Sequence, residues 1–176
     1  MKKIFLLGIS AILFIPLIPL IDWVYYRDKK LFIPPIYYTG RVPIRKDVYG
    51  EGYFGAPRRG GRLHKGLDIS ASLYSDVVAS KGGRAKTGFV KNGLGKYVMI
   101  KHPEDYVTLY GHLSEFCVKN NQRVRQGLVI GCVGKTGNAK HKSIKPHLHF
   151  EIRKDGKHLD PLLFLVVLHK SYFIDY

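Results

Sequence analysis

The sequence from residue 66 to residue 152 is dominated by short apolar segments separated by glycine and turn signals. Seven such segments occur: GLDIS (66–70), DVVAS (76–80), RAKTGFV (84–90), KYVMIKH (96–102), DYVTLYGHL (105–113), LVIGCVG (128–134) and HLHFEI (147–152). Their lengths are typical of strands, and no apolar period of 3.6 residues runs through them. Turn signals lie at 91–93, 102–105 and 155–156, and the Asp155-Gly156 pair is typical of a two-residue hairpin. We therefore expect an all-β domain built mainly from antiparallel sheets.

The last of these segments, HLHFEI, carries two histidines one residue apart. Side chains alternate between the two faces of a strand, so His147, His149 and Glu151 share one face. The apolar residues 148, 150 and 152 share the other face. An isolated His-x-His pair is weak evidence for a site, because a half-buried strand can carry histidine on its outer face by chance.

A histidine and an aspartate, His64 and Asp68, stand four positions apart in GRLHKGLDIS. This spacing places both on one face of a helix, but the surrounding glycines disfavour a helix, and an even separation also gives one face of a strand. Either arrangement lets them converge. Two imidazoles and a carboxylate can hold zinc and leave a fourth position for water, and His149 can supply the second imidazole. The alternative is a surface histidine near a structural aspartate.

His112 is the next-to-last residue of the segment DYVTLYGHL. Alternation puts residues 107 and 109 on one face, and residues 106, 108, 110 and His112 on the other, which we expect to be the polar face. His112 is then either a hydrogen-bonded residue at the strand end or a base or donor beside a metal.

Four segments in order resemble the lysostaphin-type, or LytM-type, zinc metalloendopeptidases, which are peptidoglycan hydrolases. They are GYFGAPRRGGRLHKGLDI, YGHLSE, VRQGLVIGCVGKTGN and PHLHFEIRKDGKHLDP, and the resemblance extends from about Tyr49 to Phe164. It implies the duplicated hybrid motif fold, a LytM-like β-sandwich or barrel with a groove. Residues 70–88 depart from the family pattern, because relatives often carry a Gly-x-Pro-Val-type turn there, so we expect the strand pairing after Asp68 to differ locally.

The resemblance also implies roles for five residues. His64, Asp68 and His149 would bind one zinc ion per chain, and His112 and His147 would be the catalytic histidines, with the choice of base left open. The implied function is a zinc-dependent endopeptidase that hydrolyses stem or cross-bridge peptides of peptidoglycan. The alternative is a non-catalytic module on the same fold that binds the cell wall or activates amidases, since some relatives have lost the metal ligands.

The chain divides by composition into four parts. Residues 1–21 contain two lysines followed by an apolar run from Ile4 to Ile21, which is long enough to cross a bilayer and lacks a small-x-small cleavage site. We expect an uncleaved signal or membrane anchor, with the domain facing the periplasm or the cell exterior; cleavage would make the protein secreted. Residues 22–48 read as an extended linker, 49–165 as the metallopeptidase domain and 166–176 as a C-terminal tail.

Charge indicates an anionic partner. The chain has 29 basic and 13 acidic residues, a net charge of +16, which suits nucleic acid, an acidic polymer or a membrane surface. Export disfavours nucleic acid, so peptidoglycan and the membrane remain as partners, and the oligomeric state stays open. Lysines 140, 142 and 145 in the loop before His147 could meet substrate carboxylates. Cys117 and Cys132 are interpreted as structural, either as free thiols or as a disulfide.

Overall fold

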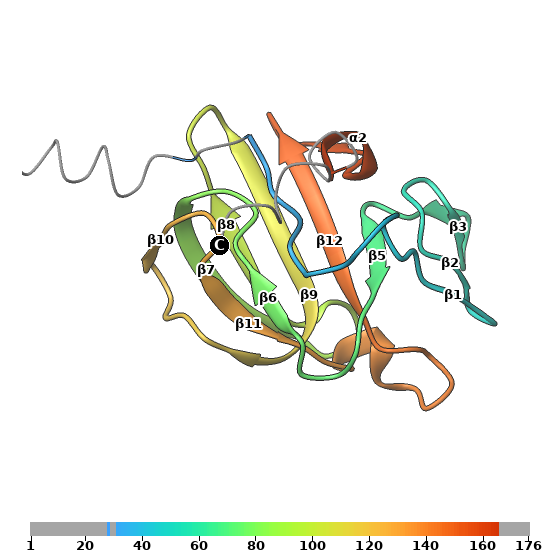
Figure 1. Cartoon of the computed structure of the whole chain (residues 1–176). Helices are drawn as coiled ribbons and strands as arrows, with labels where there is room; N and C mark the ends of the chain where they lie inside the picture. The colour runs from blue at the N-terminus through green and yellow to red at the C-terminus, as the bar shows by residue number, and fades with distance from the viewer. Residues whose placement is uncertain (1–27, 29–30, 166–176) are drawn as a thin grey trace, which may run out of the picture.

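The computed structural model describes residue 28 and residues 31–165 (Figure 1). Two short hairpins lie at one side of the fold: β1 (Lys46–Asp47) with β2 (Gly50–Glu51), and β3 (Pro57–Arg58) with β4 (Arg62–Leu63). The other strands form one sheet: β5 (Leu67–Ser70), β6 (Asp76–Val78), β7 (Gly83–Val90), β8 (Gly95–Lys101), β9 (Tyr106–Phe116), β10 (Arg123–Val124), β11 (Val129–Val133), β12 (His147–Lys154) and β13 (Lys157–Leu159). Among the described residues there are also two short helices, the 3-10 helix η1 (Gly137–Lys140) and α2 (Leu162–Leu165).

The nine-stranded sheet confirms the expected mainly antiparallel architecture. One path through it runs β10-β7-β8-β9-β11-β6, and β12 joins it by pairing with β9, β5 and β13. Strand β9 changes partner along its length, since residues up to Gly111 pair with β12 and residues from Leu113 pair with β11. His112 lies at this change of partner. The segment that carries it is therefore placed where the sheet divides.

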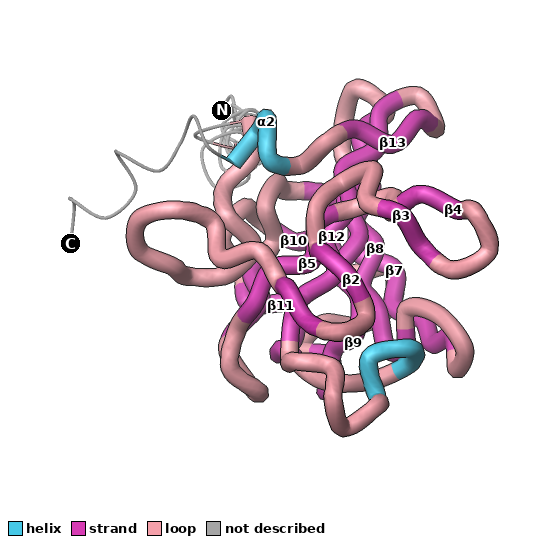
Figure 2. The backbone as a smooth tube through the Cα atoms, turned by 90° about the vertical axis from the view of Figure 1, so that its right-hand side faces the viewer, coloured by secondary structure: helices cyan, strands magenta, loops and turns pink. Residues whose placement is uncertain are grey.

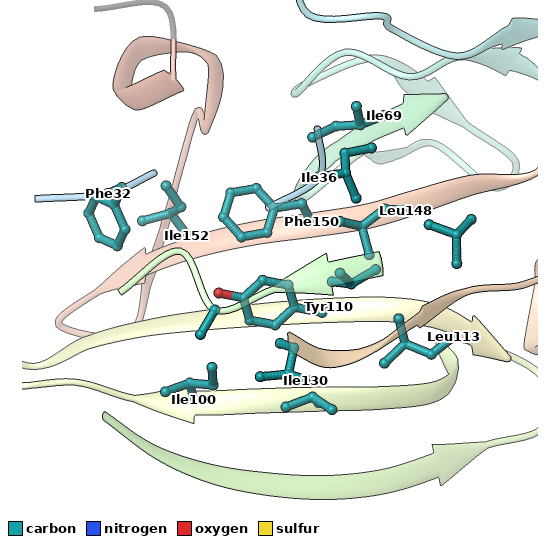
Figure 3. Close-up of a cluster of buried hydrophobic side chains, with 14 of the residues drawn as sticks. Phe32, Ile36, Ile69, Ile100, Tyr110, Leu113, Ile130, Leu148, Phe150 and Ile152 are labelled. Atoms are coloured by element: carbon teal, nitrogen blue, oxygen red, sulfur yellow. The ribbon is translucent and has the colours of Figure 1, made fainter. Parts of the chain in front are cut away.

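The core lies on one face of β12, as the alternation in HLHFEI predicts. Leu148, Phe150 and Ile152 are fully buried and pack with Tyr110 and Ile69, as Figure 3 shows. Burial of an apolar side chain of this size contributes about 1.5–3 kcal/mol. The opposite face of the strand is thereby held in one orientation.

The expected polar face of residues 106–112 is wrong. Thr108 and Tyr110 are 0% exposed and point into the core, whereas Leu109 and Val107 pair with Glu151 and Arg153 on the face opposite the core. The Tyr110 hydroxyl accepts hydrogen bonds from Ser80 N (2.8 Å) and from Thr108 Oγ1 (3.0 Å). Because these polar atoms find partners inside, the side chains can be buried without a large penalty.

The predicted hairpin at Asp155-Gly156 is confirmed. Strands β12 and β13 pair from Ile152 opposite Leu159 to Lys154 opposite Lys157, which leaves two residues in the turn. Both have positive φ, 50° for Asp155 and 74° for Gly156, as a hairpin turn that matches the twist of its strands requires.

The segment before β1 packs on the domain. Phe32, Ile36 and Tyr38 are buried in the core cluster, and Ile44 forms an isolated bridge with Ile69. The predicted anchor, residues 1–21, and the predicted tail, residues 166–176, lie outside the described residues. Within those residues no helix has the length and apolar character needed to cross a membrane. The division of the chain at residues 21, 48 and 165 stays a prediction.

Candidate metal centre

Three predicted ligands converge at one point. His64 lies in the loop between β4 and β5, Asp68 is on β5, and His149 is the residue of β12 that pairs directly with Asp68. His64 Nε2 is 3.1 Å from Asp68 Oδ1 and 3.0 Å from His149 Nδ1, and His149 Nδ1 is 2.9 Å from Asp68 Oδ1. Donors bound tetrahedrally at about 2.0 Å lie roughly 3.3 Å apart, so this donor set fits a zinc ion with little movement. His64 and Asp68 share neither a helix nor a strand; the β4–β5 loop turns the first toward the second.

Each imidazole ligand is oriented by its second nitrogen. His64 Nδ1 lies 2.8 Å from the carbonyl oxygen of Tyr53 and donates to it, which leaves Nε2 as the candidate ligand atom. His149 Nε2 lies 3.0 Å from Glu151 Oε1, which leaves Nδ1. A hydrogen bond of this kind fixes the tautomer and raises the basicity of the ligating nitrogen.

The two carboxylate oxygens of Asp68 have separate partners. Oδ1 faces the two imidazoles, whereas Oδ2 accepts hydrogen bonds from Arg45 Nη2 (3.0 Å) and Arg58 Nη2 (3.1 Å). The carboxylate is thus held so that one oxygen is presented to a metal. Burial raises the pKa of Asp68, but its hydrogen bonds with His149 and His64 outweigh burial and hold the pKa well below the usual range.

His149 lies between two carboxylates. Burial lowers the pKa of His149, but the hydrogen bonds with Asp68 and Glu151 have the larger effect and raise this pKa to about 9. Glu151 responds in the opposite sense: burial raises its pKa, and the hydrogen bond with His149 together with the pairing to Arg153 lowers it to about 2. Asp68, His149, Glu151 and Arg153 therefore form one continuous chain of charged and polar contacts.

The other two predicted site residues, His112 and His147, lie beside the three ligands. Their ring centroids are 5.0 Å apart, and His147 Nε2 is 4.0 Å from Asp68 Oδ1. His147 Nδ1 donates to the Lys145 carbonyl (2.7 Å) and His112 Nδ1 donates to the Thr136 carbonyl (2.9 Å), so Nε2 is the unengaged nitrogen of each ring. Burial, reinforced by the neighbouring imidazole, lowers the pKa of His112 to about 3, and burial also lowers that of His147.

His112 reaches the centre only through an unusual backbone conformation. Its φ is +63°, in the left-handed region that costs a residue other than glycine about 1–3 kcal/mol. Strict alternation would send its side chain to the core beside Tyr110. The irregular register between β8 and β9, where residues 111 and 112 interrupt the pairing, instead turns the imidazole to within 5.8 Å of the His149 ring.

Two glycines allow the chain to pass close to the ligands. A Cβ atom at Gly66 would lie 3.0 Å from the His149 ring and 2.5 Å from a backbone oxygen, and a Cβ atom at Gly52 would lie 2.9 Å from the Asp68 Cβ atom. Any side chain at either position would displace a ligand or its strand.

The five residues line a groove of about 480 Å³. One wall is the β3–β4 hairpin, and the other is formed by η1 and the loop that follows it; Figure 2 shows the two at separate positions on one side of the molecule. Asn138, Ala139 and Ile144 supply that second wall. Lysines 140, 142 and 145, which the sequence suggested as substrate contacts, are exposed and do not line the groove.

Sequence reasoning missed three side chains of the centre: Arg45, Arg58 and Glu151. Arg45 was assigned to the linker, and no local signal connects it with Asp68, 23 residues away. Arg58 lies in a hairpin with Arg59 and Arg62, and the sequence does not show which of these arginines contacts Asp68. Glu151 could have been found, because alternation already put it on the face of His149.

The remaining described histidines lie away from the three ligand atoms. His102 is buried and bonds the Gly82 carbonyl and Thr108 Oγ1, each at 2.8 Å, and burial lowers its pKa to about 4. His141 is exposed and contacts Tyr49 Oη at 3.0 Å. His158 packs near Glu151, and His169 lies outside the described residues.

Comparison with known proteins identifies a family. The family model of Peptidase family M23 matches residues 62–161, which include all five site residues. The DD-carboxypeptidase/endopeptidase Mpg of Neisseria meningitidis serogroup B is 43% identical over 101 residues, covering 57% of this chain and 22% of that protein. The murein hydrolase activator NlpD of Escherichia coli K12 is 36% identical over 113 residues, covering 64% of this chain and 28% of that protein. The chain thus spans about a quarter of the length of these curated relatives.

The fold also matches solved structures. The catalytic domain of the antimicrobial peptidase lysostaphin from Staphylococcus simulans superposes with a TM-score of 0.56 at 30% identity, covering 69% of this chain and 92% of that domain. The likeness extends over almost the whole of that catalytic domain.

Proposed function

The chain belongs to peptidase family M23, and on that premise we propose that it is a zinc-dependent endopeptidase that hydrolyses peptide bonds in the stem or cross-bridge peptides of peptidoglycan. His64 Nε2, Asp68 Oδ1 and His149 Nδ1 would hold one zinc ion. When bound, zinc would activate a water molecule and polarise the scissile carbonyl.

The residues of the chain would supply the rest of the chemistry. His112 and His147 each keep Nε2 unengaged beside the ligand atoms, because each Nδ1 donates to a backbone carbonyl. One imidazole would take a proton at Nε2 from the attacking water, and the other, when its Nε2 carries a proton, would donate a hydrogen bond to the oxygen that gains negative charge. Burial excludes bulk water from both rings, which strengthens these interactions.

One observation carries the proposal. The three ligand atoms lie 2.9–3.1 Å from one another, with two further buried imidazoles at the same point. Burying four histidines and a carboxylate together costs free energy unless each polar group finds a partner, so such a cluster favours a functional site over a chance arrangement.

Mass spectrometry of digested sacculi tests the proposed function. We expect the full-length protein to bind one zinc ion per chain and to release peptide fragments from purified sacculi, and we expect a chelator to stop the release. The masses of the fragments identify the bond that is cut. Stoichiometric zinc with no fragment released under any condition would contradict the endopeptidase assignment.

A second candidate function is that of a non-catalytic module that binds the cell wall or activates an amidase. The similarity to a murein hydrolase activator favours it. The complete set of three ligand atoms and two further imidazoles favours the enzyme. The two are distinguished by adding the protein to a purified amidase: an activator raises amidase activity in the presence of chelator, whereas an endopeptidase cuts alone and needs zinc.

We also propose a location in the cell envelope, with residues 1–21 as the anchor. The relation to a protein named for murein, together with the apolar run at the N-terminus, supports this. Fractionation with and without detergent tests it: recovery of the intact chain in the cytoplasmic fraction would contradict it.

A further inference from the structure

The groove that holds the metal centre has an unusual charge distribution. Among the described residues that line the groove, Asp68 is the one carboxylate. It is already paired, since its Oδ2 atom contacts Arg45 Nη2. The same lining contains five cations. They are Arg45, Arg58, Arg59, Arg62 and Lys65.

These cations fall into two groups. Arg45 pairs with Asp47 and Asp68, and Arg58 pairs with Asp68, so two carboxylates compensate these two cations. Arg59, Arg62 and Lys65 are exposed, and they form no ion pair with any residue in positions 28 and 31–165. Within the same positions, the Arg62 guanidinium makes one hydrogen bond, donating from Nε to the Arg59 carbonyl oxygen at 3.3 Å.

The β3–β4 hairpin holds Arg59 and Arg62 of this second group at the groove, and Lys65 follows in the β4–β5 loop. Arg58 stands directly opposite Arg62 in the ladder, and the turn between them contains Gly60 and Gly61, both with positive φ. Like charges directly opposite each other on a sheet are unfavourable, and the hairpin adds Arg59 beside them. Arg59 and Arg62 therefore add positive charge to the hairpin without forming an ion pair that would stabilise the fold.

The opposite wall differs. Asn138, Ala139 and Ile144 bring no charge, and Lys140 and Lys142 of the same loop are exposed outside the groove lining. A substrate in the groove would therefore meet cations on one side and neutral side chains on the other. Arginine binds carboxylates with two parallel hydrogen bonds, which gives direction as well as attraction.

We infer that the β3–β4 hairpin is a carboxylate-recognition wall, and that Arg59 and Arg62, assisted by Lys65, select acidic peptides over neutral ones. This rests on the proposed function, since it names the class of peptide that the site would cut. The substrate would carry a free carboxylate near the scissile bond. Peptides made of glycine or of amidated residues would be poor substrates.

The test compares two forms of one substrate at pH 7. The probes are soluble cross-linked disaccharide peptides with free carboxylates, and the same peptides after conversion of the carboxylates to amides. We expect the full-length zinc-loaded protein to prefer the acidic form by roughly five- to thirtyfold in kcat/KM, mainly through KM, as one or two charge-assisted contacts would give. In the double variant Arg59→Gln/Arg62→Gln, we expect the preference to shrink to about twofold or less.

The matched control is Lys140→Gln/Lys142→Gln, which removes the same charge from the opposite loop without touching the groove lining. It is expected to keep the full preference. Zinc content and circular dichroism establish that each variant is folded. Equal cleavage of both probes by the unmodified protein, or a preference that survives in the arginine variant, would overturn the inference.

Failure of the proposed function is recognised separately. If neither probe is cut, calorimetric binding of the two probes to the full-length protein decides the inference alone. Tighter binding of the acidic probe that is lost in Arg59→Gln/Arg62→Gln supports the wall, and equal binding of the two probes refutes it.

Discussion

Strand β12 has two faces whose side chains are held in different ways. On one face, Leu148, Phe150 and Ile152 are fixed by shape and burial among other apolar groups. On the other face, His149 is fixed by single named contacts, Nδ1 toward Asp68 and Nε2 toward Glu151. Both faces are buried, so the difference does not lie in exposure to water.

The comparison teaches how the two faces respond to change. A packed apolar face tolerates substitutions that conserve volume, because dispersion and burial are not directional. A polar face fails when a single atom is lost, because the partner atom is then left buried without a hydrogen bond. We therefore expect changes on the apolar face to alter stability and changes on the polar face to alter metal binding and catalysis.

The largest effect is expected from His149→Ala, which removes a ligand atom from the polar face. Loss of a residue that only hydrogen-bonds a metal ligand typically lowers metal affinity about ten- to a hundredfold. Loss of the ligand itself should therefore lower it roughly a thousandfold or more. Metal analysis after dialysis is expected to find no stoichiometric zinc.

His64→Ala removes another candidate ligand, from the β4–β5 loop rather than from the sheet, and is expected to give the same result. The control is His141→Ala, an exposed histidine that does not line the groove. Retention of one zinc ion by both ligand variants would refute the assignment of the centre.

The next effect is expected from Phe150→Ala on the apolar face. Removing a buried aromatic side chain leaves a cavity and typically costs about 3–5 kcal/mol in the free energy of unfolding. Denaturant unfolding of the metal-free protein measures it. Phe89→Ala, at a position 61% exposed, should change stability little. If Phe150→Ala left stability intact but released zinc, the division of labour between the two faces would be wrong.

A smaller effect is expected from His147→Gln, on the polar face next to the ligands. The variant keeps the three ligand atoms, so zinc content should be unchanged. Activity on sacculi should fall by about a hundred- to a thousandfold, the usual cost of losing one stabilising donor or base. His141→Gln is the control. Full activity with full zinc in His147→Gln would remove this residue from the catalytic role.

Much of the apolar face could be predicted from sequence, because alternation within HLHFEI needs only the pleat of one strand. The same rule fails on β9, where it sends His112 to the side of Tyr110. The backbone at His112 is left-handed because the sheet changes partner there, and such a change depends on strands far away in sequence. Local pattern carries no information about it.

The five site residues could be proposed from sequence, but most of the groups that orient them could not. Three of the five imidazole and carboxylate groups are oriented by backbone carbonyls, of Tyr53, Thr136 and Lys145. Every residue has a carbonyl, so no residue type signals this use. Arg45 similarly meets Asp68 only because the segment before β1 returns to the sheet at Ile44.

The smallest effect is expected from Glu151→Gln, which tests whether the polar face is held by charge as well as by shape. Glutamine has nearly the same size and can still accept from His149 Nε2, but it cannot carry the charge that now balances Arg153. Zinc affinity should fall by about ten- to a hundredfold, measured by competition with a chelator of known affinity, while stoichiometry at saturating zinc stays at one. Glu115→Gln, an exposed carboxylate, is the control. Because Glu151 contacts His149 at Nε2 and not at the ligand atom Nδ1, an unchanged affinity would mean that packing alone orients His149, and the two faces of β12 would then be held by the same means.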